Sequence, residues 1–245
     1  MERGRSSSAA EQRTRRRLAA AGTIALASAA AVTARHQLRN WGATPRELAL
    51  ELPGDELIAD PASTTTRAIA IHAPPHEVWR WLVQIGQDRG GWYSYEGLEN
   101  LFGLDIHNTD EIRPEWQQLS PGDQVRVVPP GALGMQDGYA FRVAIAVPGR
   151  SLVLRQAPPE HPWDATWAFI MIPDGWGGTR LLVRSRSARQ PGTSGRLAQV
   201  GGELLDPITL LMTRKMLLSI RARAEFAHQK RLRDAAVADR RLVGV

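Results

Sequence analysis

The chain has 245 residues, enough for one hydrophobic core with additional terminal segments. It contains no cysteine, which excludes disulfides, cysteine nucleophiles and thiolate metal ligands. Its net charge of +6 comes from the two ends of the chain. Residues 1–46 hold nine basic and two acidic side chains, and residues 214–245 hold nine basic and three acidic ones. Residues 47–213, in contrast, hold 13 basic and 20 acidic side chains. Because a nucleic-acid-binding domain is basic in its folded body, we predict no nucleic-acid partner.

The N-terminal segment divides into a polar, basic part at residues 1–17 and an apolar part that follows. We expect residues 1–17 to be disordered and assign residues 18–39 to a hydrophobic segment. Three interpretations are open: a single transmembrane anchor, a cleaved signal peptide, or an Ala-rich soluble helix. The basic flank before the apolar run favours the anchor, and with it a membrane localisation and an extracytoplasmic domain.

Residues 40–62 are predicted to link this segment to a folded domain. One short helix is expected there, from about Pro45 to Leu50. The rest of the segment either packs on the domain or is a plain spacer.

The domain is expected to begin with a strand and two short helices. The strand is predicted at residues 63–72, which are rich in Thr and Ile, with Arg67 toward its solvent end. Pro74-Pro75 suit the exit of a strand and the first turn of a helix. Apolar residues at i, i+3 and i+4 between residues 78 and 85 predict that helix. A glycine-rich loop and an aromatic cluster at residues 92–95 then lead into the second one.

Five further strands are predicted between turns rich in Gly and Pro: residues 124–128, 138–147, 152–156, 165–172 and 179–187. Several alternate between apolar and other residues, which marks an antiparallel sheet with one covered and one solvated face. The apolar faces are assigned to the odd-numbered residues from Tyr139 to Val147, to Trp167, Phe169 and Met171, and to Leu181 and Val183. Three arginines alternate with the last two residues, and we expect them to form a solvated outer face: Arg180, Arg184 and Arg186.

A long C-terminal helix is predicted to start at Asp206-Pro207, where an Asp N-cap precedes a Pro at the first helical position. It is expected to continue to about Leu232, with residues 234–245 as a tail. An amphipathic helix and a sheet with one apolar face can each bury that apolar side only against the other. The fold class is therefore predicted to be α+β, with a curved antiparallel sheet wrapped around the long helix.

This order of elements resembles the START-like (SRPBCC, polyketide-cyclase-like) superfamily. The residues that carry the resemblance are TTTRAIAIHAPPHEVWRWLVQIG, the loop GQDRGGWYSYEGLENLFGLDIH, the strand pair WAFIMIP and TRLLVRSR, and the helix ITLLMTRKMLLSIRARAE. The resemblance covers about residues 63–226, and we assign a START-like domain to residues 63–233. It implies a helix-grip fold, in which the sheet and the long helix enclose an apolar cavity.

Aromatic and thioether side chains on the expected inner faces are the candidates for lining this cavity. The predicted ligand-pocket residues are Trp92, Tyr93, Tyr95, Phe141, Trp167, Phe169, Met171, Leu211, Met212 and Met216. The alternative is that these side chains fill a solid core, as aromatic sheet faces commonly do.

Catalytic and metal-binding patterns are sparse in the sequence. No phosphate-binding loop, metal-ligand spacing or nucleophile motif is present, so we predict no metal and no cofactor. The polar loop after the two short helices supplies the candidates for acid–base catalysis: His107, Tyr93, Glu99 and Asp105. Arg89 in the same loop is expected to pair with Asp105 or Glu99 and so to fix the loop.

Three functions remain in competition. The favoured one is binding or carriage of an apolar small molecule, such as a lipid, an isoprenoid or a polyketide-like compound, by a domain tethered to a membrane. One alternative is a structural or interaction domain whose cavity is filled. The other is a cyclase- or dehydratase-like enzyme that uses acid and base residues in the same pocket. The sequence does not distinguish oligomeric states.

Overall fold

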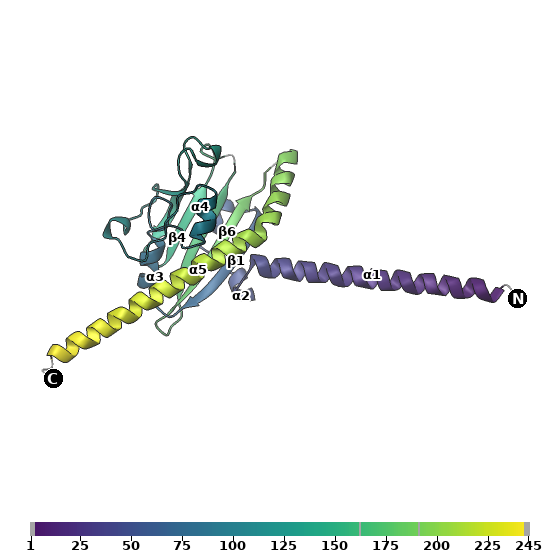
Figure 1. Cartoon of the computed structure of the whole chain (residues 1–245), viewed down its shortest axis with the longest axis horizontal. Coiled ribbons are helices and arrows are strands. Elements are labelled where there is room, and N and C mark those ends of the chain that lie inside the picture. The colour runs from purple at the N-terminus through teal and green to yellow at the C-terminus, as the bar shows by residue number, and fades with distance from the viewer. Residues whose placement is uncertain (1–2, 162, 191, 243–245) are drawn as a thin grey trace. The chain divides into compact units, whose positions relative to one another are not determined.

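The computed structural model describes residues 3–161, 163–190 and 192–242 (Figure 1). The chain divides into two units, Met1–Arg39 and Asn40–Val245. The first unit is a single helix, α1 (Arg3–Arg39), which includes the basic residues that we expected to be disordered.

The hydrophobic anchor predicted at residues 18–39 is not supported. Among the described residues, no helix combines the length and the mean hydropathy that a membrane crossing requires. The apolar run of α1 consists mainly of alanine, interrupted by Gly, Thr and Ser.

The second unit begins with α2 (Pro45–Leu48) and a 3-10 helix, η1 (Asp55–Ile58). After the first strand come α3 (Pro75–Leu82), α4 (Glu96–Leu101) and η2 (Pro114–Trp116), and η3 (Ala132–Gly134) follows the second strand. The strands are β1 (Pro61–Ile71), β2 (Gln124–Val128), β3 (Tyr139–Val147), β4 (Ser151–Gln156), β5 (Ala165–Pro173) and β6 (Thr179–Ala188). The long helix α5 (Gly192–Leu242) is last. All six predicted strands are therefore confirmed to within about two residues.

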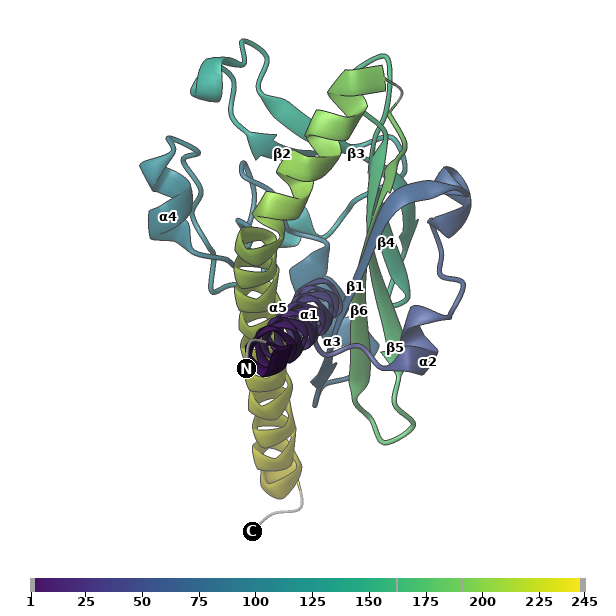
Figure 2. The same cartoon turned by 90° about the vertical axis from the view of Figure 1, so that its right-hand side faces the viewer.

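The strands form one antiparallel sheet in the order β1-β6-β5-β4-β3-β2. Strands β2 to β6 are a meander, and β1 pairs with the last strand of that meander. The helices α3 and α5 contact each other and the same sheet (Figure 2). This arrangement is the helix-grip fold that the resemblance to the START-like superfamily implied.

The start of α5 differs from the prediction. The helix begins at Gly192 and contains Pro207 in its interior, whereas the sequence pattern indicated an N-terminus at Asp206. A proline inside a helix removes one backbone hydrogen bond and bends the axis, and α5 bends in its first third (Figure 2). An Asp-Pro pair is therefore compatible with both a helix start and a bend, and local sequence does not separate the two.

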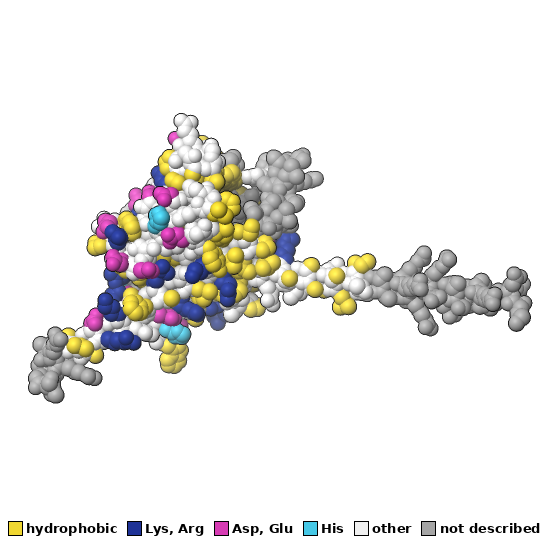
Figure 3. All heavy atoms as spheres, in the orientation of Figure 1, with side chains coloured by type: hydrophobic (Ala, Val, Ile, Leu, Met, Phe, Trp, Pro, Cys, Tyr) yellow, Lys and Arg dark blue, Asp and Glu magenta, His cyan; other side chains and the backbone are white. Residues whose placement is uncertain are grey.

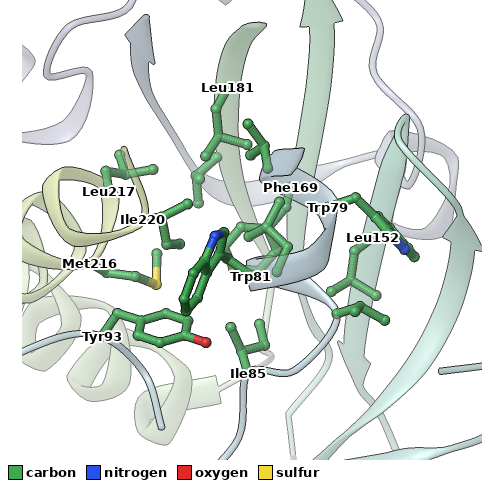
Figure 4. Close-up of a cluster of buried hydrophobic side chains, with 14 of the residues drawn as sticks. Trp79, Trp81, Ile85, Tyr93, Leu152, Phe169, Leu181, Met216, Leu217 and Ile220 are labelled. Atoms are coloured by element: carbon green, nitrogen blue, oxygen red, sulfur yellow. The ribbon is translucent and has the colours of Figure 1, made fainter. Parts of the chain in front are cut away.

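The main core lies between the inner face of the sheet and the helices α3 and α5. Figure 4 shows Trp81 of α3 with Met216 and Ile220 of α5 beside it and Phe169 of β5 nearby. Burial of such large side chains is the main stabilising contribution to the domain. The inner faces predicted for β5 and β6 are confirmed, because the side chains assigned to them line this core or the cavity beside it.

The face predicted for β3 is wrong beyond Val143. A β-bulge interrupts the pairing of β3 with β4 between Val143 and Ile145. An extra residue in a strand reverses the alternation that follows, so Val143 lies in the main core and Ile145 packs against the outer one. Nothing in the apolar alternation of β3 indicates where this residue is inserted.

The outer face of the sheet is covered by residues 40–58, so the predicted linker is part of the domain. A second apolar cluster forms there between Leu52 and the sheet residues Val153, Ala168 and Leu182. Asn40 also contributes its side-chain oxygen, which accepts a hydrogen bond from the Thr66 amide at 3.3 Å. Of the two alternatives that the sequence left open, packing on the domain is correct.

The prediction that the β6 arginines are solvated is wrong for the same reason. The Arg184 side chain is only 4% exposed and donates to Asp55 Oδ2 at 2.6 Å. The same guanidinium donates to Thr66 Oγ1 and to the backbone oxygens of Glu47, Leu48 and Leu50. Arg180 pairs with Glu47 at 2.7 Å and Arg186 with Asp55 at 3.3 Å. These arginines hold the N-terminal segment of the domain against the sheet.

Candidate ligand cavity

A cavity of about 390 Å³ lies on the inner side of the sheet, beside the main core. It is surrounded by side chains from α4, from the segments before and after α4, from all six strands and from α5. Strand β4 contributes only Gln156, its last residue. Its lining residues are Arg67, Trp92, Ser94, Glu99, Leu104, Ile106, Val127, Phe141, Gln156, Ala165, Thr166, Trp167, Ser185, Ser187, Thr209, Met212, Thr213 and Met216. The α5 residues come from the part of the helix just after its proline.

One wall of the cavity is aromatic. The rings of Trp92 and Trp167 are stacked with their centroids 5.3 Å apart, and Phe141 lies 5.8 Å from Trp167. Met212 and Met216 of α5 add thioether side chains to the lining. Aromatic and thioether groups offer polarisable apolar contact without fixed hydrogen-bond demands, so this wall suits an apolar guest.

The loop between α4 and β2 is held in place by its own side chains and by α5. Asn108 Oδ1 accepts from the Tyr93 amide at 2.6 Å, and a Cβ placed on Gly91 would lie 2.5 Å from the same oxygen. Arg223 of α5 donates to Asp110 at 2.6 Å and to the Thr109 carbonyl at 3.1 Å. The loop, held by α5, therefore braces the neighbouring segment at Gly91 and Tyr93, which carries Trp92 into the cavity.

Arg67 lies inside the domain, so its predicted place at a solvent end of the strand is wrong. It is 5% exposed, lines the cavity, and donates from Nη1 to Thr213 Oγ1 at 3.1 Å. Its position follows from alternation, because Arg67 is in phase with Ile69 and Ile71, which point into the core.

Glu99 is the buried carboxyl of the cavity, with 4% of the residue exposed. Burial, with a smaller effect of the Glu96 charge, raises the pKa of Glu99 to about 7. Its Oε2 atom and the Nε1 atom of Trp92 have no hydrogen-bond partner among the described residues. Two unsatisfied polar atoms therefore belong to side chains that line one cavity.

The predicted pocket residues fall into three groups. Five line the cavity: Trp92, Phe141, Trp167, Met212 and Met216. Three are buried in the core instead: Tyr93, Phe169 and Met171. The remaining two, Tyr95 and Leu211, are exposed. Leu211 thus lies off the α5 face that carries Met212 and Met216.

The four candidates for acid–base catalysis are not brought together. His107 lies at the surface between Glu96 and Asp105, 3.2 Å from a carboxylate oxygen of each, and these hydrogen bonds raise its pKa. The Tyr93 hydroxyl is buried and accepts from Gln84 at 2.8 Å, and burial raises its pKa to about 12. Only Glu99 reaches the cavity.

Arg89 fixes the loop, but not through the carboxylates that we expected. Its Nη2 donates to the backbone oxygens of Val83 and Trp116. Burial lowers the pKa of Arg89. No group of three His, Asp or Glu side chains in the described part of the chain is arranged to hold a metal ion.

Several polar lining residues were not predicted: Arg67, Gln156, Ser185, Ser187, Thr209 and Thr213. Ser185 and Ser187 continue the inward phase of Leu181 and Val183 along β6. Strand alternation therefore indicates them, although the predicted pocket contained only aromatic, leucine and methionine side chains. Thr209 and Thr213 are one turn apart on α5 and could have been found from Met212 in the same way.

Met212 should tolerate truncation better than a methionine in the solid core. We expect Met212→Ala to lower the free energy of unfolding by about 2 kcal/mol, because space already adjoins this side chain. The matched change Met171→Ala should cost about 4 kcal/mol, since Met171 is 3% exposed and packs in the core. Urea denaturation of both variants measures the difference, and equal losses would mean that Met212 is packed on all sides.

Comparisons with known proteins do not indicate a function for the chain. No family model matches the chain, and no curated protein matches it. The chain is similar to a solved protein from Chromobacterium violaceum, with 16% identity, a TM-score of 0.38 and coverage of 66% of this chain and 96% of that one. A protein from Mesorhizobium loti and the Aha1 dimer from Colwellia psychrerythraea give the same identity and coverage with a TM-score of 0.35. Because these TM-scores are low, the fold assignment rests on the strand order and on α5, and not on superposition with the solved structures.

Proposed function

We propose that this helix-grip domain binds an apolar small molecule, such as a lipid, an isoprenoid or a polyketide-like compound, in the cavity beside α5. The observation that carries the proposal is the aromatic and thioether lining of a space of about 390 Å³. Small-molecule sites are typically concave, mostly apolar and largely pre-formed, with a few polar groups that orient the ligand. The cavity has this composition.

Binding accounts for the cavity better than the alternatives do. A domain with a filled core would not leave a space of this size beside the stacked Trp92 and Trp167 rings. The cyclase- or dehydratase-like alternative would use an acid and a base within reach of one substrate. Here His107 and Asp105 are exposed outside the cavity lining, and Glu99 is left as its only carboxyl group among the described residues.

The surface beside the cavity suits the entrance of an apolar ligand. The helix α4 contributes Glu99 to the lining and carries exposed Leu98 and Leu101, and exposed Phe102 directly follows it. Figure 3 shows hydrophobic side chains gathered over α4 and the neighbouring part of α5. We infer that the ligand reaches the cavity on this side, and such transfer does not depend on a membrane anchor.

Titration of the full chain with the neutral fluorescent dye N-phenyl-1-naphthylamine tests the proposal. We expect saturable binding of one dye per chain. Ser185→Phe places a large side chain in the cavity and should weaken binding at least about tenfold, because the overlapping volumes cannot both be accommodated. Ser120→Phe, at an exposed turn, is the matched control and should bind normally. Equal affinity in both variants would place the dye elsewhere and contradict the proposal.

A further inference from the structure

The cavity contains two buried polar groups that the proposed apolar contacts leave unsatisfied. Trp92 is 6% exposed and Glu99 is 4% exposed, and both line the cavity. Trp92 Nε1 and Glu99 Oε2 have no hydrogen-bond partner among the described residues. Unsatisfied buried polar atoms destabilise a fold and are rare in native proteins. Two of them at one cavity therefore point to a polar atom of the ligand.

The chemistry of the two groups decides what that atom is. An indole nitrogen is a hydrogen-bond donor only, and a protonated carboxyl also donates. Burial raises the pKa of Glu99 to about 7, which favours the protonated form at and below neutral pH. Glu96 on the same helix adds to this shift, Arg67 of β1 also lines the cavity, and Lys215 of α5 lies over the ring of Tyr95, which directly precedes α4.

We propose that the ligand is a neutral apolar molecule that carries a carbonyl oxygen, and that this oxygen accepts hydrogen bonds from Glu99 and Trp92. A carbonyl oxygen has two lone pairs and can accept from both donors at once. The apolar remainder of the ligand then contacts Trp167, Phe141 and Met216. This inference rests on the proposed function, and it adds the class of compound that the cavity selects.

A matched pair of ligands tests the inference on the full chain. 2-Acetonaphthone and 2-ethylnaphthalene have nearly the same shape, and only the first carries a carbonyl oxygen. Their affinities are measured at pH 6 by displacement of N-phenyl-1-naphthylamine. We expect the ketone to bind about tenfold more tightly, because each buried hydrogen bond that it completes adds to its affinity.

The variants assign this preference to the two side chains. Glu99→Leu and Trp92→Phe should each bring the affinity ratio of the two ligands closer to one, whereas Glu115→Gln, an exposed control on η2, should leave it unchanged. In the wild type the ratio should fall between pH 6 and pH 8, as Glu99 ionises and ceases to donate. In Glu99→Gln the amide still donates at all pH values, so the preference should persist without pH dependence.

The other outcomes separate the two proposals. Equal affinities for the ketone and the hydrocarbon would overturn the carbonyl inference and leave apolar binding intact. Failure of the dye and of both naphthalenes to bind would overturn the proposed function. Tighter binding of 2-naphthylmethylammonium, with an affinity that rises with pH, would show that Glu99 acts as a carboxylate that binds a cation, and would also overturn the carbonyl inference.

Discussion

Replacement of Arg184 by methionine is expected to lower the free energy of unfolding by about 3–5 kcal/mol. The guanidinium of Arg184 is almost fully buried, and its removal leaves the Asp55 carboxylate without its 2.6 Å partner. It also removes the guanidinium donor from the backbone oxygens of Leu48 and Leu50, and one of the donors to the backbone oxygen of Glu47, which still accepts from the Leu50 amide. The covering segment would then detach from the outer face of the sheet and expose the apolar cluster around Leu52.

The control for this prediction is Arg142→Met on β3. Arg142 pairs with Glu160 at 3.1 Å, but both side chains are about half exposed. Solvent screens such a pair, so its loss should cost no more than about 1 kcal/mol. Urea denaturation followed by tryptophan fluorescence measures both values. Equal losses in the two variants would mean that residues 40–58 are not held by a buried ion pair.

Glu99 should make the stability of the domain fall as the pH rises. Its pKa is raised from the ordinary value of 4.5 to about 7, so the folded protein binds this proton more tightly than the unfolded chain does. The stabilising contribution is therefore complete below pH 4.5 and is lost as the pH rises through 7. The difference between the two pKa values corresponds to about 3 kcal/mol.

Comparison with Glu99→Gln isolates this contribution, because the glutamine cannot ionise. Other groups act in the opposite direction: hydrogen bonding to Arg180 lowers the pKa of Glu47 to about 2, and that stabilisation is lost as the pH falls. Between pH 4 and pH 8 the wild type should lose about 3 kcal/mol of unfolding free energy relative to Glu99→Gln. A difference that stays constant over this range would mean that Glu99 ionises at its ordinary pKa and is solvated.

Local sequence patterns predict the strands because each strand keeps one apolar face in contact with the core. The alternation of Trp167, Phe169 and Met171 is such a pattern, and it identifies the inner face of β5. The same reasoning fails at Val143 and Ile145, where a bulge adds one residue without a sequence signal. It also fails at Asp206-Pro207, because Pro207 bends a helix that has already begun.

These local patterns do not predict contacts between residues that are far apart in the sequence. Alternation correctly places Arg184 on the outer face of β6, but whether that face is solvated depends on residues 40–58, which are far away in the sequence. The candidate site shows the same limit. The sequence suggested Glu99 as an acid or base or as a partner of Arg89, whereas in the structure it lines a cavity to which β1, β5 and α5 also contribute side chains.

A crystal structure of the chain with N-phenyl-1-naphthylamine tests the central claim most directly, because it locates the ligand. We expect density for one dye molecule between α5 and the inner face of the sheet, in contact with Trp92, Trp167 and Met216. A dye bound only at the outer surface, with the side chains of these residues closing the cavity, would contradict it.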